Sequence, residues 1–162
     1  MIVVGIDPGL SGAIARYDSD LNTLQVEDMP TFLLVRNGKK KRDVDLSSCA
    51  RIIDDMTKQA GTRICVEQVS SMPGQGVSSV FAFGKAYGIV LGICAATFCP
   101  LETVTPAVWK RALSVPAVKD GARARASALL PIHAGLWTRA KDDGRAEASL
   151  LAYYLSTNGE RR

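Results

Sequence analysis

Short apolar runs bounded by turn residues dominate the start of the chain and predict strands. Residues 2–6 form a continuous apolar run that ends at Asp7-Pro8-Gly9, which is the pattern of a buried strand followed by a turn. Two shorter alternating segments, 13–17 and 23–28, are separated by the polar residues 18–20. Together the three segments predict a β-meander that opens the domain.

The pattern then changes from strands to a helix. The segment 30–42 is basic, and we expect it to be a mobile connection. Apolar residues recur every three or four positions across 46–56, which predicts a helix with Asp43 or Asp45 as its N-cap. Gly61 is expected to end this helix.

The remainder of the chain alternates strands with helices and ends in three helices. Residues 63–66 are an apolar strand that places Glu67 at its tip, and the segment 68–76, which contains Ser, Pro and Gly, is expected to be a loop. The later elements are a long helix, a strand and three helices: 77–96, 101–104, a helix that starts at Thr105-Pro106, 120–130 and 142–155. This order, βββαβαβααα, predicts an α/β domain with a mixed sheet. The length of 162 residues fits one domain that spans 1–162.

Composition excludes several classes of protein. With 47% hydrophobic and 22% charged residues, the chain is neither disordered nor a disulfide scaffold. The sequence has no run of about 18 uncharged apolar residues and no visible signal peptide, so we expect no membrane association and a cytoplasmic location, or the host cytoplasm for a phage-encoded protein. The four cysteines form no Cys-x-x-Cys pair and are expected to be reduced thiols, not zinc ligands.

Basic residues gather in two parts of the chain. Residues 105–145 hold eight basic and three acidic residues, an excess larger than the net charge of +4 of the whole chain, and residues 39–42 are all basic. A solvated surface explains either cluster alone, but two clusters in a chain of pI 9.0 favour a polyanionic partner. The expected phosphate contacts are Lys39, Lys40, Lys41, Arg42, Lys110, Arg111, Lys119, Arg123, Arg139, Lys141 and Arg145.

Four carboxylates occupy the ends of predicted elements. Asp7 and Glu67 follow strands, and Asp143 and Glu147 lie four residues apart on the last helix, about 6 Å from one another on one face. Each has an ordinary alternative, because Asp is common in turns and acidic residues stabilise the first turn of a helix. A set of oxygen ligands without Cys or His nevertheless suits Mg²⁺ or Mn²⁺. Two such ions about 4 Å apart can clamp the attacking and leaving oxygens of a phosphodiester, so no side-chain nucleophile is needed.

Three motifs resemble those of the RuvC-type Holliday-junction resolvases. They are Ile2–Gly12 (IVVGIDPGLSG), Val66–Val69 (VEQV) and Lys141–Ala148 (KDDGRAEA), in family order and spread over nearly the whole chain. The helix with Trp109-Lys110 and the Gly-rich helix after Gly76 are also similar, most of all to the RuvC-like branch of phages and organelles.

The resemblance implies an RNase H-like nuclease, with a mixed β-sheet flanked by helices, that cuts four-way DNA junctions by paired symmetric nicks. It implies that Asp7 bridges two Mg²⁺ ions, with Mn²⁺ as a substitute, and that Glu67, Asp143 and Glu147 complete the ligand set. Lys110 would approach the scissile phosphate or the attacking water, with Lys119 as the alternative lysine. No small-molecule cofactor is implied.

The last motif departs from the family pattern. Bacterial members usually carry two aspartates three residues apart, whereas here the spacing is four and the second acid is Glu147. On a helix, residues 143 and 147 are offset by about 40°, while 142 and 147 are offset by about 140°. We therefore expect Asp143 to be the ligand and Asp142 to be free to cap the helix. The loop before residue 77 offers only Met72 and Pro73 where many such enzymes have an aromatic residue.

Substrate symmetry and the resemblance both favour a homodimer, because a junction must be nicked on two strands at related positions. The helix 77–96 is the candidate interface, and an ordinary core helix is the alternative. Competing functions are another RNase H-like nuclease, such as an RNA-processing YqgF-type protein, and a non-catalytic DNA-binding module. An actin-like kinase would need about twice this length.

Overall fold

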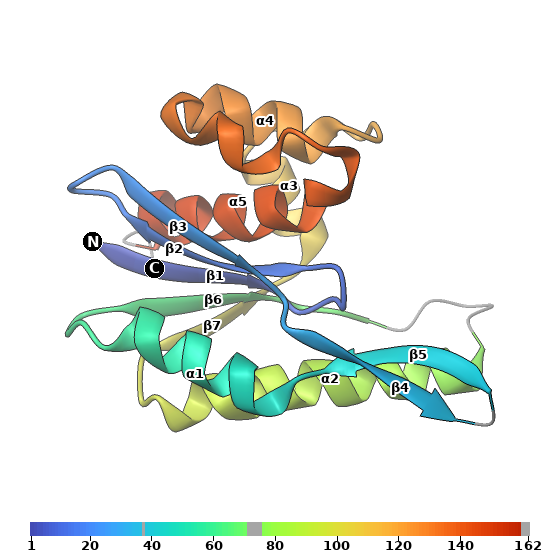
Figure 1. Ribbon diagram of the computed structural model, residues 1–162. Helices are drawn as coiled ribbons and strands as arrows, with labels where there is room; N and C mark the ends of the chain where they lie inside the picture. The colour runs from blue at the N-terminus through green and yellow to red at the C-terminus, as the bar shows by residue number, and fades with distance from the viewer. Residues whose placement is uncertain (37, 71–75, 160–162) are drawn as a thin grey trace.

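A five-stranded mixed sheet lies at the centre of the molecule (Figure 1). The computed structural model describes residues 1–36, 38–70 and 76–159. β1 (Ile2–Asp7), β2 (Ala13–Asp18) and β3 (Thr23–Asp28) form the predicted antiparallel meander. β6 (Arg63–Glu67) and β7 (Leu101–Val104) continue the sheet in parallel on the other side of β1, which gives the order β3-β2-β1-β6-β7.

Helices cover both faces of this sheet, as Figure 1 shows. On one face lie α1 (Leu46–Thr57) and α2 (Val77–Ala96). The other face carries α3 (Pro106–Ala112), α4 (Gly121–Leu129) and α5 (Asp143–Asn158), with the 3₁₀ turns η1 (Pro131–Trp137) and η2 (Ala140–Asp142) between α4 and α5. The predicted α/β architecture, a mixed sheet flanked by helices, is confirmed.

The alternation of side chains along β1 determines which residues face each helical layer. Val4 and Ile6 belong to the core under α1 and α2, whereas Val3 belongs to the core under α5. Gly5 faces α5 so closely that a Cβ there would lie 2.2 Å from the carbonyl oxygen of Ala148. Since alternate residues of a strand share a face, the strand directs Asp7 toward the α5 side.

The same alternation applies to β6. Ile64 and Val66 join the core under α1 and α2, and Cys65 joins the core under α5. Glu67 therefore lies on the α5 side of the sheet, as Asp7 does.

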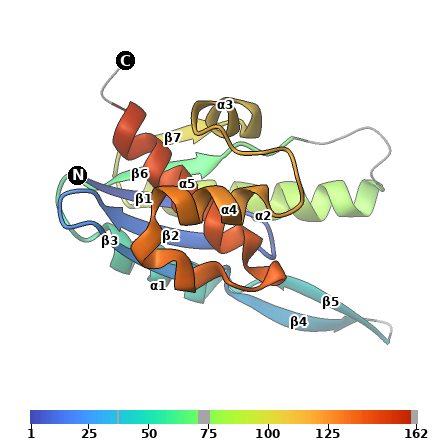
Figure 2. The same ribbon diagram turned by 90° about the horizontal axis from the view of Figure 1, so that it is seen from above.

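The prediction that the segment 30–42 is a connection without strands is wrong. This segment forms most of a separate two-stranded hairpin, β4 (Thr31–Arg36) and β5 (Lys39–Val44), which extends away from the main sheet (Figure 2). Its apolar side chains Phe32 to Val35 are 42–69% exposed, so the ribbon buries no face of its own. Without a buried face, the sequence has no reason to alternate apolar and polar residues, and the strand signal is missing.

Most predicted helix boundaries agree with the structure. Asp45 is the N-cap of α1 and accepts a hydrogen bond from the Ser48 amide, whereas the helix ends at Thr57, before Gly61, which adopts a φ of 82° in the turn that follows. Thr105 precedes α3 with Pro at its first turn, and α5 continues to Asn158, beyond the predicted residue 155. Of the predicted loop 68–76, residues 71–75 lie outside the described residues.

Two further features concern the class of protein. All four cysteines are free thiols, and three of them are buried. Among the described residues, no helix combines the length and apolar character needed to cross a membrane.

Candidate active site

Asp7 and Glu67 end two neighbouring parallel strands. The register pairs Gly5 with Cys65 and Ile6 with Val66, so Asp7 and Glu67 occupy the next positions along the two strands. Both side chains also share the α5 side of the sheet. The carboxyl end of β1 and β6 thus brings two acids together from sequence positions 60 residues apart, as the sequence predicts.

α5 and α3 bring two more charged groups to this end of the sheet. α5 crosses β1, and Glu147 lies in its second turn. The Lys110 Nζ on α3 donates a hydrogen bond of 2.6 Å to Glu147 Oε1. Both side chains are partly buried, with 39% of Lys110 and 21% of Glu147 exposed, which strengthens the ion pair relative to one on an open surface.

Each of the two strand-end acids has a fixed donor. The backbone N–H of Gly9 donates to Asp7 Oδ1 at 3.0 Å, which closes the turn after β1. The indole Nε1–H of Trp109, a fully buried side chain, donates to Glu67 Oε1 at 2.9 Å. Lys110, the next residue, places its ammonium 5.1 Å from the centre of the Trp109 ring.

Burial and mutual repulsion make these carboxylates hard to ionise. Burial raises the pKa of Asp7 from 3.8 to about 7; the Gly9 hydrogen bond opposes this rise, the charges of Glu147 and Glu67 add to it, and Lys110 opposes it. Burial also raises the pKa of Glu67, against the Trp109 hydrogen bond, and Glu147 adds to the rise. For Lys110, burial lowers the pKa but Glu147 outweighs it, so the net shift is upward and the ammonium stays charged at neutral pH. The charges of three carboxylates, Glu147, Glu67 and Asp7, act on the one ammonium of Lys110, which leaves the cluster short of positive charge.

Asp142 and Asp143 at the start of α5 pair with arginines, whereas Glu147 pairs with Lys110. Asp143 Oδ1 accepts a 2.7 Å hydrogen bond from Arg123 Nε of α4, and the carboxylate is 42% exposed. The charged groups that most affect the pKa of Asp7 are Glu147, Glu67 and Lys110. The expected ligand Asp143 therefore lies at the edge of the cluster, held by an arginine.

Asp142 is buried and has a structural role. Its carboxylate accepts hydrogen bonds from the backbone N–H of Arg139 at 2.9 Å and from the Arg139 guanidinium at 2.8 Å. These bonds hold the pKa of Asp142 down at about 2. Asp142 precedes α5 at the N-cap position, as predicted, but its side chain binds the preceding turn and does not cap the helix.

The residues expected to contact phosphate divide into two groups. Several are engaged within the protein: Lys110 with Glu147, Arg123 with Asp143 and Asp120, Arg139 with Asp142, and Arg145 with Asp28. The others are exposed: Lys40, Lys41, Arg42, Arg111, Lys119 and Lys141. The side chain of Lys39 lies outside the described part of the structure.

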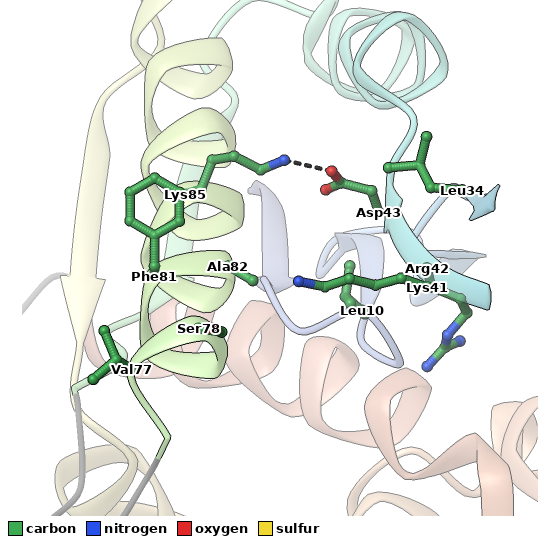
Figure 3. A pocket seen from close by; sticks show the side chains of 10 residues that line it. All are labelled: Leu10, Leu34, Lys41, Arg42, Asp43, Val77, Ser78, Phe81, Ala82 and Lys85. Carbon is green, nitrogen blue, oxygen red and sulfur yellow. Dashed lines mark hydrogen bonds and ion pairs between the residues drawn. The ribbon is translucent and has the colours of Figure 1, made fainter. Parts of the chain in front are cut away.

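The hairpin connects the basic cluster to the turn after Asp7. The Arg42 guanidinium donates a 2.7 Å hydrogen bond to Ser11 Oγ in that turn. A groove of about 500 Å³ separates the hairpin from the start of α2, and Lys85 pairs with Asp43 across it (Figure 3). Its walls combine apolar and basic side chains: Leu10, Leu34, Lys41, Arg42, Val77, Phe81 and Lys85. Arg42 of the hairpin therefore lies beside the turn that follows Asp7.

The donor chemistry of the cluster fits a hard divalent cation. All candidate ligands are carboxylate oxygens, and the raised pKa of Asp7 is the effect that a nearby cation would reverse. In the described part of the chain, no three Asp, Glu, His or Cys side chains are gathered closely enough to hold a metal ion. The hydrogen bonds explain this arrangement, because Lys110, Trp109 and Arg123 draw Glu147, Glu67 and Asp143 toward different partners.

Comparison with solved structures identifies the fold of the chain. Thermus thermophilus RuvC in complex with a Holliday-junction substrate is 16% identical, with a TM-score of 0.64 over 99% of this chain and 95% of that chain. The chain has the RuvC fold. A second Thermus thermophilus RuvC structure is 18% identical, with a TM-score of 0.57 over 98% and 95% of the two chains. The yeast mitochondrial Holliday junction resolvase Ydc2 is 14% identical, with a TM-score of 0.52 over 99% and 81%.

At the level of sequence the likeness to RuvC is thin. No protein-family model and no curated protein matches the chain. The likeness to RuvC therefore lies in the fold, at sequence identities below 20%.

Sequence reasoning missed contacts that the RuvC fold builds around Asp7. Gly12 lies so close to Asp7 that a Cβ there would come within 2.7 Å of the Asp7 Cγ, and Trp109 donates to Glu67 across 42 residues of chain. The motif IDPGLSG contains the glycine signal, whereas nothing in the sequence links Trp109 to Glu67.

Proposed function

We propose that the chain is a structure-selective endonuclease that resolves four-way (Holliday) DNA junctions by metal-dependent hydrolysis of phosphodiesters. The observation that carries this proposal is the convergence of Asp7, Glu67, Glu147 and Lys110 at one end of the sheet in a RuvC fold. One of the solved structures with this fold is a complex with a Holliday-junction substrate.

The acidic residues are the proposed ligands for two Mg²⁺ ions, for which Mn²⁺ can substitute. When bound, the ions supply a water nucleophile and stabilise the departing 3′ oxygen. Asp7, Glu67 and Glu147 would hold these ions through their carboxylate oxygens. Asp143 would join them by leaving Arg123, because it lies one helical turn before Glu147.

The chain's own residues prepare this site before any ion is present. Gly9 and Trp109 fix one oxygen of Asp7 and of Glu67, so both carboxylates keep a defined orientation. Lys110 offsets part of the negative charge and remains protonated, which suits it to bind the scissile phosphate once Glu147 turns to an ion.

Exposed basic residues are the proposed contacts to the DNA backbone. Lys40, Lys41 and Arg42 are exposed on the hairpin, and Arg42 contacts the turn after Asp7. Arg111, Lys119 and Lys141 are also exposed. Arg123, Arg139 and Arg145 are each paired with an acid of the protein, so each could contact a phosphate only while it also binds that acid.

A homodimer is part of the proposal, because paired symmetric nicks need two identical sites. The candidate interface is α2, where Val77 and Phe81 are 86% and 74% exposed. Exposed apolar residues of this size on one helix are typical of a surface that is covered by a partner.

The test is a cleavage assay with Mg²⁺ on a synthetic four-way junction, with duplex, flap and RNA/DNA hybrid substrates of the same sequence. We expect paired nicks in the junction and far slower cleavage of the other three. Preferred cleavage of the hybrid would favour the RNA-processing class of RNase H-like nuclease. Tight junction binding without cleavage in Mg²⁺ or Mn²⁺ would make the chain a DNA-binding module.

A further inference from the structure

We propose that Trp109 is a positioning residue that orients the Glu67 carboxylate for cation binding. This inference rests on the proposed metal site, and it adds a residue outside the set of carboxylates and lysine already assigned to the chemistry. Trp109 acts through Glu67 and touches neither substrate nor metal.

The contact between the two residues is buried and directional. Trp109 Nε1 lies 2.9 Å from Glu67 Oε1, Trp109 is 0% exposed and Glu67 is 9% exposed. Among the residues that the structure describes, Trp109 is the one hydrogen-bond donor to this carboxylate. The indole has a single N–H, which donates along one direction and accepts nothing. It therefore fixes one oxygen of Glu67 and leaves the other oxygen to a different partner.

Trp109 also belongs to the element that binds both of the acids whose charges act on Asp7. It belongs to the seven-residue helix α3, in which the next residue, Lys110, donates to Glu147. The Lys110 ammonium lies over the Trp109 ring, 5.1 Å from its centre. One short helix therefore holds Glu67 and Glu147 at the same time, through two adjacent side chains.

The second tryptophan of the chain provides a matched control. Trp137 is equally buried, at 2% exposure, and its Nε1 donates a hydrogen bond of the same length, 2.9 Å, to Ser127 Oγ. Both tryptophans belong to the core under α5. Substitution by Phe removes the same donor and similar volume at each, but only Trp109 contacts a site carboxylate.

The experiment compares Trp109→Phe with Trp137→Phe in the full chain by two measurements that need no cleavage. The first is the Mg²⁺ concentration that gives half of the Mg²⁺-dependent rise in Tm. Because partners that orient a metal ligand are worth about 10–100-fold in metal affinity, we expect at least a tenfold increase for Trp109→Phe and none for Trp137→Phe.

The second measurement is a double-mutant cycle in EDTA with Glu67→Met, which removes the acceptor. Hydrogen bonds to charged groups are strong, so Trp109→Phe should shift the unfolding equilibrium about tenfold more with Glu67 present than in the Glu67→Met background. Trp137→Phe should shift it equally in both backgrounds.

A third arm does not depend on whether Trp109→Phe folds. In the Trp137→Phe protein, Trp109 is the single tryptophan. Mg²⁺ should shift its fluorescence emission, because the cation neutralises the charge of Glu67. Where Trp109→Phe also folds, the emission of Trp137 in that protein should not respond to Mg²⁺.

Equal responses of the two tryptophans to Mg²⁺ and equal coupling to Glu67 would overturn the proposal and make Trp109 an ordinary core residue. These outcomes are separate from the proposed function. If the wild type cuts no junction but the two variants differ as expected, the nuclease assignment fails and the positioning role remains.

Discussion

Gly144 at the start of α5 lies directly against Gly12 in the turn after β1. A Cβ at Gly144 would come within 2.6 Å of the Gly12 Cα and within 2.4 Å of the Ser11 carbonyl oxygen. Gly12 in turn lies against Asp7. The two glycines thus set how closely α5, which carries Asp143 and Glu147, approaches the end of β1.

Gly144→Ala should therefore move α5 away from Asp7. Overpacking of this kind costs about 1–3 kcal/mol of unfolding free energy, and a displacement of about 1 Å at a reaction centre can slow catalysis about 100-fold. We expect both effects, measured by urea denaturation and by junction cleavage in Mg²⁺. Gly135→Ala in η1 is the control, because Gly135 is exposed and its Cβ would meet nothing within 4 Å. Full activity of Gly144→Ala would show that the close approach is not needed.

The raised pKa of Asp7 predicts a pH dependence of folding in EDTA. Because the pKa is about 7 in the folded protein and 3.8 as the ordinary value, folding takes up a proton between these pH values. The stabilisation by this group is fully present below pH 3.8 and is lost as the pH rises through 7. At about 1.4 kcal/mol per pKa unit, the loss is at most about 4 kcal/mol of unfolding free energy.

Asp7→Asn removes this titration. Urea denaturation at pH 5, 6, 7 and 8 should show the wild type losing stability relative to Asp7→Asn as the pH rises. Mg²⁺ at pH 8 should restore more stability to the wild type than to the variant. A constant difference between the two proteins across the pH range would mean that Asp7 titrates normally.

The sequence allowed the paired acids to be predicted, but not the contacts that hold them. Asp7 and Glu67 follow apolar runs, and parallel strands bring such ends together. The hairpin was missed because Leu34 pairs with Lys41 in a ribbon without a buried face, so neither strand alternates. The Trp109–Glu67 bond depends on how α3 packs against β6, which is tertiary information that no local pattern contains.

The start of α5 provides a test of which aspartate is a ligand. Asp142 is held by Arg139, and an Asn at this position can still accept the hydrogen bond from the Arg139 N–H. We expect Asp142→Asn to keep most of the cleavage activity, and Asp143→Asn and Glu147→Gln each to abolish it. The cleavage rate and the Tm of all three variants are measured. Asp142→Asn loses its ion pair with Arg139, so we expect a lower Tm with little change in its cleavage rate. An inactive Asp142→Asn with an active Asp143→Asn would reverse the assignment.

The hairpin predicts a salt dependence of DNA binding. Replacing Lys39, Lys40, Lys41 and Arg42 by Ala should weaken junction binding and reduce the slope of log K against log salt by about 1 for each phosphate that the variant no longer neutralises. Lys58→Ala is the control, because Lys58 is an exposed lysine already paired with Asp55. An unchanged slope in the hairpin variant would leave its cations as solvated surface charges.

The proposed function assigns the hydrolysis of junction DNA to ions held by the carboxylates at the ends of β1 and β6. It is tested most directly by measuring single-turnover cleavage and binding of one four-way junction on the same samples of wild type and Asp7→Asn, in Mg²⁺. The charges of both Glu147 and Glu67 act on Asp7, so loss of Asp7 from this set should lower the cleavage rate by orders of magnitude while the dissociation constant for the junction changes little. Cleavage by Asp7→Asn at the rate of the wild type would contradict the account.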